Sequence, residues 1–369
     1  MFDSFVGLAG RLLGYTNTDN LWSAAVVTGT AEGSGLIVRG RDCVRNLRQL
    51  RASGQTQLLV ADTALWTNTE ATTTTPMLVP ESDGLFATTL DDWAASVISA
   101  GADVVLTRSL FVREGDWGAL RAVLRVGEEA TRPDVMTLVA TDAAMLGPTY
   151  RPRFLDILAR GVRGERPLAF VFADQREPLS RRERIAGLRA LLAQHPASLL
   201  LATDMLAGTD VITRGGGAAV GVTSSLRHPA RPRDDGGPPA VGWVPGLFLR
   251  QLWETRSPAT YADWYADSPL PTCEDCGGRA MTTFTNHPDD KAQILKHNIH
   301  GWLAVFGEIR RRQPTAARDW LNHERRRALA AHADLRPRST ALQADRLLRS
   351  LCELDDPEQR RTTATGGWR

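Results

Sequence analysis

Short, wholly apolar runs alternate with amphipathic helical segments between residues 35 and 225. The first pair is the strand GLIVRG and the helix RDCVRNLRQLRASG, and later runs end in VAD, VLT, VATD, FAD and LATD. Strands that are apolar on both faces and alternate with helices predict a parallel sheet covered by helices. Six or seven such units, with a strand or hairpin expected in residues 1–34, favour a (β/α)8 TIM barrel over an open doubly wound sheet.

The remaining chain divides by pattern and composition. We expect the barrel in residues 35–270, a zinc-binding segment in 271–312 and a basic helical tail in 313–369. The aromatic stretch 241–271 is expected to be helical, and three further helical patterns follow the zinc-binding segment.

Composition is that of a soluble globular protein, with 43% hydrophobic and 23% charged residues. No apolar stretch has the length that a bilayer requires, and the N-terminus lacks a signal-peptide pattern, so we expect a cytoplasmic protein without a membrane segment. The net charge of +2 hides an arginine excess in residues 301–369. Such a segment suits a polyanion such as DNA or RNA. A homodimer is an open alternative to a monomer.

Cysteine and histidine converge in the segment 271–306. Cys273 and Cys276 form a Cys-x-x-Cys pair, and His297 lies on the helix that follows. This is a pattern of structural zinc sites, and zinc prefers four ligands. His300, one helical turn on, and His287 compete as the fourth ligand, with His300 favoured. The alternative is that both cysteines simply pack in a Gly-rich turn and the histidines lie on a helix surface.

Four predicted strands end in carboxylates, namely Asp62, Asp142, Asp174 and Asp204. In a barrel the active site lies where strands end and loops begin, and converging carboxylates can divide nucleophilic and acid/base roles. Asp also favours strand ends and helix N-caps for hydrogen bonding alone. For any single one of these residues the structural interpretation is the simpler one, but four in corresponding places favour a functional role for at least one.

Arginines also follow predicted strands. Arg108 and Arg227 fall on loops where a guanidinium can hold a phosphate or a base edge. Arg231 lies in the polar run PARPRDD, where solvation is the simpler interpretation. The three glycines Gly215 to Gly217 precede a strand and lack the lysine of a P-loop, so they more simply end a helix.

The order of barrel, Cys-x-x-Cys and a His-Asn helix start resembles the tRNA-guanine transglycosylase family and its relatives that insert 7-deazapurines into DNA. Cys273 and Cys276 match the second and third cysteines of the family's zinc motif, and His297-Asn298-Ile299 matches its helix start. Pro271 stands where the family has its first cysteine, which is why His300 or His287 enters as a substitute.

The resemblance covers roughly residues 57–310 and is weaker at the chemical positions. LVADTALW lies where the family has LTDSGGFQ, which places Asp62 on the family's base-exchange aspartate. The family's nucleophilic aspartate falls at Gly221 or Val222. Its guanine-reading aspartate falls near Arg108 and Ser109.

The resemblance implies a base-exchanging glycosyltransferase that acts on DNA or RNA, with a structural zinc ion. Asp62 is then the expected acid/base or nucleophilic carboxylate, and Asp142 and Asp204 are candidates to replace the missing partner. The family's IIQGG glutamine falls near Thr141 and Asp142. One alternative is a catalytically inactive relative that binds nucleic acid or a partner protein, in an antiviral or DNA-modification gene cluster. A barrel-type zinc hydrolase is a third.

Overall fold

The computed structural model describes residues 7–78, 88–162, 166–175, 177–232, 243–273, 277–335 and 342–356. The chain forms two compact units. One contains Met1–Pro178 with Gly187–Pro238, and the other contains Leu179–Ala186 with Pro239–Arg369. Each unit is described separately below.

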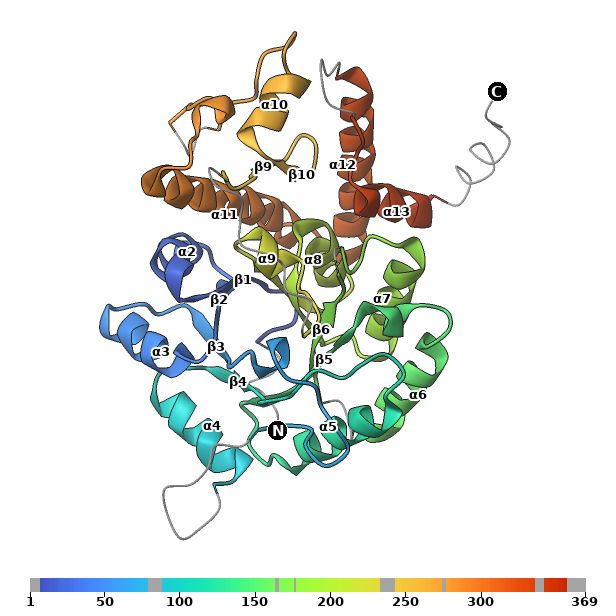
Figure 1. Ribbon diagram of the computed structural model, residues 1–369. Coiled ribbons are helices and arrows are strands. Elements are labelled where there is room, and N and C mark those ends of the chain that lie inside the picture. The colour runs from blue at the N-terminus through green and yellow to red at the C-terminus, as the bar shows by residue number, and fades with distance from the viewer. Residues whose placement is uncertain are drawn as a thin grey trace. The chain divides into compact units, whose positions relative to one another are not determined.

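The first unit is a closed barrel of eight parallel strands, as the sequence predicts (Figure 1). Each strand pairs with the next in chain order, and β1 closes the ring by pairing with β8. Almost every strand residue is buried, because one face fills the barrel and the other lies under helices. The strands are β1 Leu12–Thr16, β2 Ser34–Arg39, β3 Leu58–Asp62, β4 Val104–Leu106, β5 Val135–Asp142, β6 Leu168–Ala173, β7 Leu199–Thr203 and β8 Gly217–Gly221.

The connecting helices lie outside the ring and bury one face (Figure 1). In α3, Leu47 and Leu50 are buried while Arg45 and Arg48 are exposed, which is the amphipathic pattern that the sequence shows. The α-helices are α2 Leu21–Thr28, α3 Cys43–Ala52, α4 Leu90–Ser99, α5 Trp117–Glu129, α6 Arg151–Gly161, α7 Arg182–Gln194, α8 Met205–Ile212 and α9 Ser224–Arg227. Short 3-10 turns are η1 Thr18–Asn20, η2 Leu65–Thr67 and η3 Ala143–Leu146.

The N-terminal segment, expected as a strand or hairpin apart from the barrel, supplies the first β/α pair of the ring. β1 pairs in parallel with β2, and α2 follows it. The helix was not predicted because its sequence LWSAAVVT carries no charge and shows no polar face. Trp22 and Val26 remain 47% and 57% exposed on its outer side.

The second unit contains four α-helices and a two-stranded antiparallel sheet within the described residues. Its apolar core includes Leu247, Tyr261, Trp264, Phe284 and Ile294. The helices are α10 Pro258–Trp264, α11 Pro288–Arg310, α12 Pro314–Asp334 and α13 Arg346–Asp355, and η5 spans Met281–Thr283. Across the described residues, none of the helices has both the length and the apolar character needed to cross a bilayer.

The expectation of a helical segment over 241–271 is wrong in its first half. β9 Leu247–Leu249 pairs with β10 Glu254–Arg256, and only then does α10 begin. The Tyr261 hydroxyl donates to the backbone oxygens of Leu247 and Glu254, at 3.0 and 2.9 Å, and so holds both strands. Strands of three residues are too short to show a period of two, so the sequence gives no signal for them.

Candidate functional site

Two strand-end carboxylates meet on one arginine at the barrel rim. Asp142 ends β5, Asp174 follows β6, and the register pairs Asp142 with Ala173, so the two carboxylates are neighbours. Arg231 places Nε 2.5 Å from Asp142 Oδ2, and its Nη2 donates to Asp174 Oδ1 at 3.0 Å. Solvation of Arg231, the simpler interpretation of its polar run, is therefore wrong: its charge lies against two carboxylates. We call these three residues the carboxylate sector.

Asp142 is a buried carboxylate with a raised pKa. Its side chain is 3% exposed. Burial raises its pKa, and the negative charges of Glu114 and Asp174 raise it further. A hydrogen bond from the Ala144 backbone N–H and the Arg231 charge act in the opposite direction without cancelling the effect of burial. A carboxyl group with a raised pKa exchanges protons closer to neutral pH, which suits general acid/base chemistry.

Asp62, the carboxylate that the resemblance favours, is fully buried. It accepts hydrogen bonds from the Tyr15 hydroxyl at 2.6 Å and the Ala64 backbone N–H at 2.7 Å, with Trp66 Nε1 at 3.5 Å. These contacts join β1 to the turn after β3, where Ala64 has a left-handed φ of 52°. Asp62 therefore has a structural task, and its role in catalysis stays a prediction.

Asp204 and Arg227 lie together where β7 and β8 end. Asp204 caps α8 by accepting from the Ala207 backbone N–H at 2.8 Å. Arg227 is buried and donates to the Gly221 backbone oxygen at 3.2 Å. Burial lowers the pKa of Arg227 to about 10, an effect that the Asp204 charge partly opposes. Burial and the Arg227 charge lower the pKa of His228 to about 4, so this imidazole is neutral at physiological pH.

Arginines on β2 and after β4 lie over aromatic rings. The Arg39 guanidinium carbon is 5.7 Å from the Tyr15 ring centroid and 5.8 Å from that of Trp66. The Arg108 guanidinium carbon is 5.5 Å from the Trp93 ring centroid. We call Arg39 and Arg108 the arginine sector. Arg39 was missed at the sequence level, although it ends the strand GLIVRG just as Asp62 ends VAD.

Ser109, the other residue expected near the base-reading position, has a structural environment. It is 1% exposed, and its hydroxyl lies 2.8 Å from the Thr107 hydroxyl. Thr107 in turn accepts a hydrogen bond from the Leu138 backbone N–H at 2.9 Å. This pair ties the end of β4 to β5.

The position of the family's nucleophile carries no carboxylate. A Cβ on Gly221 would lie 2.1 Å from the Leu226 carbonyl carbon and 2.4 Å from the Arg227 backbone nitrogen. The clash arises because α9 turns back directly over the end of β8. Val222 is buried and donates its backbone N–H to the Tyr15 oxygen at 3.0 Å. Gly221 therefore excludes any side chain.

The predicted zinc segment, in the second unit, begins with a short antiparallel pairing, which we call the hairpin. Thr272 and Ala280 form an antiparallel bridge, and the Gly278 backbone N–H donates to the Cys273 oxygen at 3.0 Å. Gly277 and Gly278 have left-handed φ values of 66° and 73°, which glycine adopts without strain. Cys273 thus lies directly after this pairing. Cys276 lies outside the described residues.

His297 is oriented in the manner of a metal ligand. Its Nε2 lies 2.9 Å from the Phe248 backbone oxygen. Because a carbonyl oxygen only accepts, Nε2 carries the proton of this hydrogen bond. Ligating histidines commonly donate their other ring N–H to a backbone carbonyl. The next residue, Asn298, accepts from the Phe248 N–H at 2.6 Å and donates to the Gly246 oxygen at 2.9 Å.

Arg279 ties the hairpin to the helix face that carries the histidines. Its Nη1 donates to Asp290 Oδ1 and Gln293 Oε1, both at 2.8 Å. Gln293, His297 and His300 follow at helical spacings of four and three, so they share one face of α11. Cysteine and histidine are residue types that zinc takes as ligands. Within the described ranges, which omit Cys276, no group of three or more such side chains gathers closely enough to hold a metal.

His287, the competing fourth ligand, has another task. It is the N-cap of α11, where its Nδ1 accepts from the Asp289 backbone N–H at 3.3 Å. Its side chain is 66% exposed. His300 remains the better-placed alternative, because it shares the helix face of His297.

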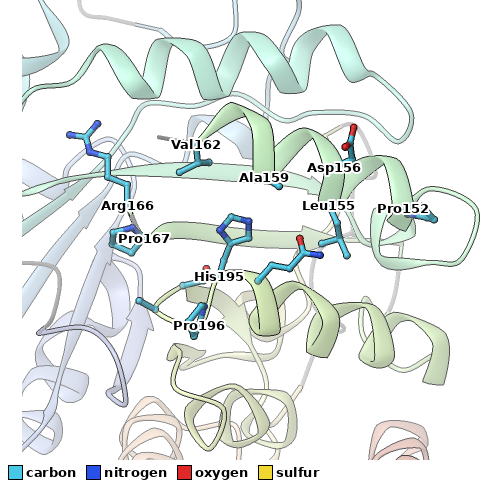
Figure 2. A pocket seen from close by; sticks show the side chains of 12 residues that line it. Pro152, Leu155, Asp156, Ala159, Val162, Arg166, Pro167, His195 and Pro196 are labelled. Atoms are coloured by element: carbon cyan, nitrogen blue, oxygen red, sulfur yellow. The ribbon is translucent and has the colours of Figure 1, made fainter. Parts of the chain in front are cut away.

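A separate cavity of about 880 Å³ opens between α6 and the C-terminal end of α7 (Figure 2). Leu155 and Ala159 of α6 form one wall, and His195 and Pro196 form the other. Pro167 and Ser198, which also line it, precede β6 and β7. The cavity therefore lies at the N-terminal ends of these strands, whereas barrel active sites lie at the C-terminal ends. No predicted site residue lines this cavity, so the candidate site is the rim at the C-terminal ends of the strands.

No protein-family model matches this chain, and no curated protein matches it.

Proposed function

We propose that this protein is a tRNA-guanine-transglycosylase-like enzyme that exchanges a base, such as a 7-deazapurine, in DNA or RNA at the rim of its barrel. The observation that carries the proposal is the carboxylate sector. Two carboxylates lie side by side there against one arginine, and they differ in burial: Asp142 is 3% exposed with a raised pKa, and Asp174 is 18% exposed. Pairs whose environments differ in this way divide acid and base roles.

Base exchange breaks the bond between the sugar C1′ and the base nitrogen. In the proposal, Asp142 in its protonated form donates its proton to the leaving base and then recovers one from the incoming base. Asp174, whose side chain is 18% exposed and accepts from Arg231, attacks the C1′ carbon as the base leaves, and the incoming base then forms the new bond to C1′ and displaces Asp174. Asp62 and Asp204 then hold the rim loops through their hydrogen bonds to backbone groups.

Zinc has a structural part in this proposal. Cys273, Cys276, His297 and His300 would hold the ion, which when bound cross-links the hairpin to α11. The His297 hydrogen bond to Phe248 supports this ligand set. The expected localisation is cytoplasmic, and the expected partners are a nucleic acid and a free base.

The transfer of a labelled base into DNA and into tRNA tests the proposal, with Asp142→Asn and Asp174→Asn as variants. The matched control is Glu129→Gln, which removes an exposed carboxylate on α5. Loss of a positioned acid/base group lowers the rate by about 10²- to 10⁴-fold.

A second candidate is an inactive relative that binds nucleic acid or a partner protein. The steric exclusion at Gly221 favours it, because the chain cannot carry a nucleophile there without moving α9. This candidate predicts nucleic-acid binding without base transfer, and unchanged binding when Asp142 is replaced by Asn.

A further inference from the structure

The barrel rim is divided by charge. The carboxylate sector lies at the ends of β5 and β6, where Arg231 is engaged by Asp142 and Asp174. The arginine sector lies at β2 and β4, the two neighbours of β3. A substrate that spans the mouth therefore meets Arg39 and Arg108 on one side, where the Asp62 carboxylate between them is fully buried, and Asp142 and Asp174 with their shared Arg231 on the other.

Arg39 forms no ion pair with the strand-end carboxylate beside it. The register pairs Arg39 with Asp62, yet Asp62 accepts from Tyr15, Ala64 and Trp66. Within the described ranges, no acidic side chain forms an ion pair with Arg39. Its buried Nε has no hydrogen-bond partner in these residues either. Its guanidinium instead lies over the Tyr15 and Trp66 rings, which fix its direction.

Arg108 repeats this arrangement two strands away. Its Nε donates to the Leu78 backbone oxygen, its guanidinium lies over Trp93, and no ion pair joins it to an acidic residue of the described ranges. Burial lowers the pKa of Arg108 without neutralising it. Strands two apart in a sheet are separated by about 10 Å. Two arginine side chains are long enough to reach one anion that lies between them.

We propose that Arg39 and Arg108 form a phosphate-binding subsite, which holds a phosphate ester of the substrate nucleotide while its sugar and base lie over the carboxylate sector. Planar guanidinium groups match phosphate oxygens with two parallel hydrogen bonds, and their aromatic supports reduce the freedom lost on binding. This inference rests on the proposed function for the identity of the nucleotide. The phosphate chemistry itself rests on the two arginines.

Equilibrium binding tests the subsite without requiring catalysis. The probes are guanosine, guanosine 5′-monophosphate and a short fluorescein-labelled single-stranded oligonucleotide. The proteins are the full chain, Arg39→Gln, Arg39→Lys, Arg108→Gln and the control Arg45→Gln, which removes an arginine that is 62% exposed on α3. Thermal melting of each variant checks folding. Binding of the monophosphate but not the oligonucleotide identifies a free nucleotide as the phosphate source, and the reverse identifies a strand.

We expect Arg39→Gln and Arg108→Gln each to weaken binding of the phosphorylated probe by about tenfold or more, because a charge-assisted hydrogen bond is lost. Guanosine binding should not change, Arg39→Lys should recover part of the loss, and Arg45→Gln should behave as the parent. For the oligonucleotide, each loss should also flatten the plot of log affinity against log salt by about 0.7.

The inference is overturned if the parent binds no phosphorylated probe, or if the two Gln variants leave phosphate-dependent binding unchanged. It is also overturned if they weaken guanosine equally. Phosphate-dependent binding without base transfer contradicts the proposed function alone. Base transfer with phosphate-independent binding contradicts the subsite alone.

Discussion

Arg231 lies with its Nε 2.5 Å from Oδ2 of Asp142, although 89 positions separate the two residues in the chain. The same guanidinium also donates a hydrogen bond to Asp174, so it joins the two carboxylates. One cation thus lies between a buried carboxyl group whose pKa is raised and a neighbouring carboxylate. The acid/base role proposed for Asp142 and the nucleophilic role proposed for Asp174 depend on this contact.

The raised pKa of Asp142 predicts a pH dependence of stability. A folded-state pKa above the unfolded value gives a contribution that is fully present in acid and is lost as pH rises through the folded pKa. Asp142→Asn, which mimics the protonated form, should therefore gain stability relative to the parent as pH rises from 4 to 7. The gain should be about 1.4 kcal/mol for each unit by which the pKa is raised. Urea unfolding across this range measures it, and a pH-independent difference would show that Asp142 is not perturbed.

Asn298 should be a stability residue of the second unit. Its side chain satisfies the Phe248 N–H and the Gly246 oxygen, so Asn298→Ala leaves both without their partner. We expect a loss of about 2 to 3 kcal/mol in the free energy of unfolding. The control is Asn286→Ala at an exposed position. Equal stability of the two variants would contradict this account of β9.

Zinc content tests the metal segment. Protein purified without chelators should contain about one zinc ion per chain. Cys273→Ser and Cys276→Ser should lose the metal and melt at a lower temperature, whereas Cys352→Ser should keep the metal, because the buried Cys352 lies on α13. Elemental analysis combined with thermal melting gives the answer. Absence of zinc, together with unchanged melting of both thiol variants, would show that this segment does not bind a structural zinc ion.

Gly221 should not tolerate a side chain. Gly221→Ala puts a Cβ within 2.1 Å of the Leu226 backbone, so α9 must move. We expect a loss of about 3 kcal/mol or more in the free energy of unfolding. Gly307→Ala is the control, because nothing lies within 4 Å of its added Cβ and α11 should gain about 0.5 to 1 kcal/mol. A well-tolerated Gly221→Ala would show that the turn is adaptable.

The barrel was predictable because its strands are apolar at every position and its helices mostly are not. β2 and α3 show this contrast plainly. α2 does not, since LWSAAVVT carries no charge and shows no polar face, and the helix of the first β/α unit was missed for that reason. The pair β9 and β10 was missed because three residues cannot display a period.

The candidate site was predictable in its positions but not in its pairings. Strand ends identified Asp142 and Asp174. Arg231 was assigned to solvent because its local sequence is polar, and no pattern in a single sequence shows which distant residues it will meet. Asp62 shows the converse, since a carboxylate in a family-like position is fully buried under Tyr15 and Trp66.

Transfer of a labelled 7-deazapurine base into DNA and tRNA by the parent and by Asp142→Asn tests the central claim most directly. The account predicts transfer into at least one nucleic acid, a decrease of about 10²-fold or more in Asp142→Asn, and parental activity in Glu129→Gln. Nucleic-acid binding without any base transfer, unchanged by Asp142→Asn, would contradict it.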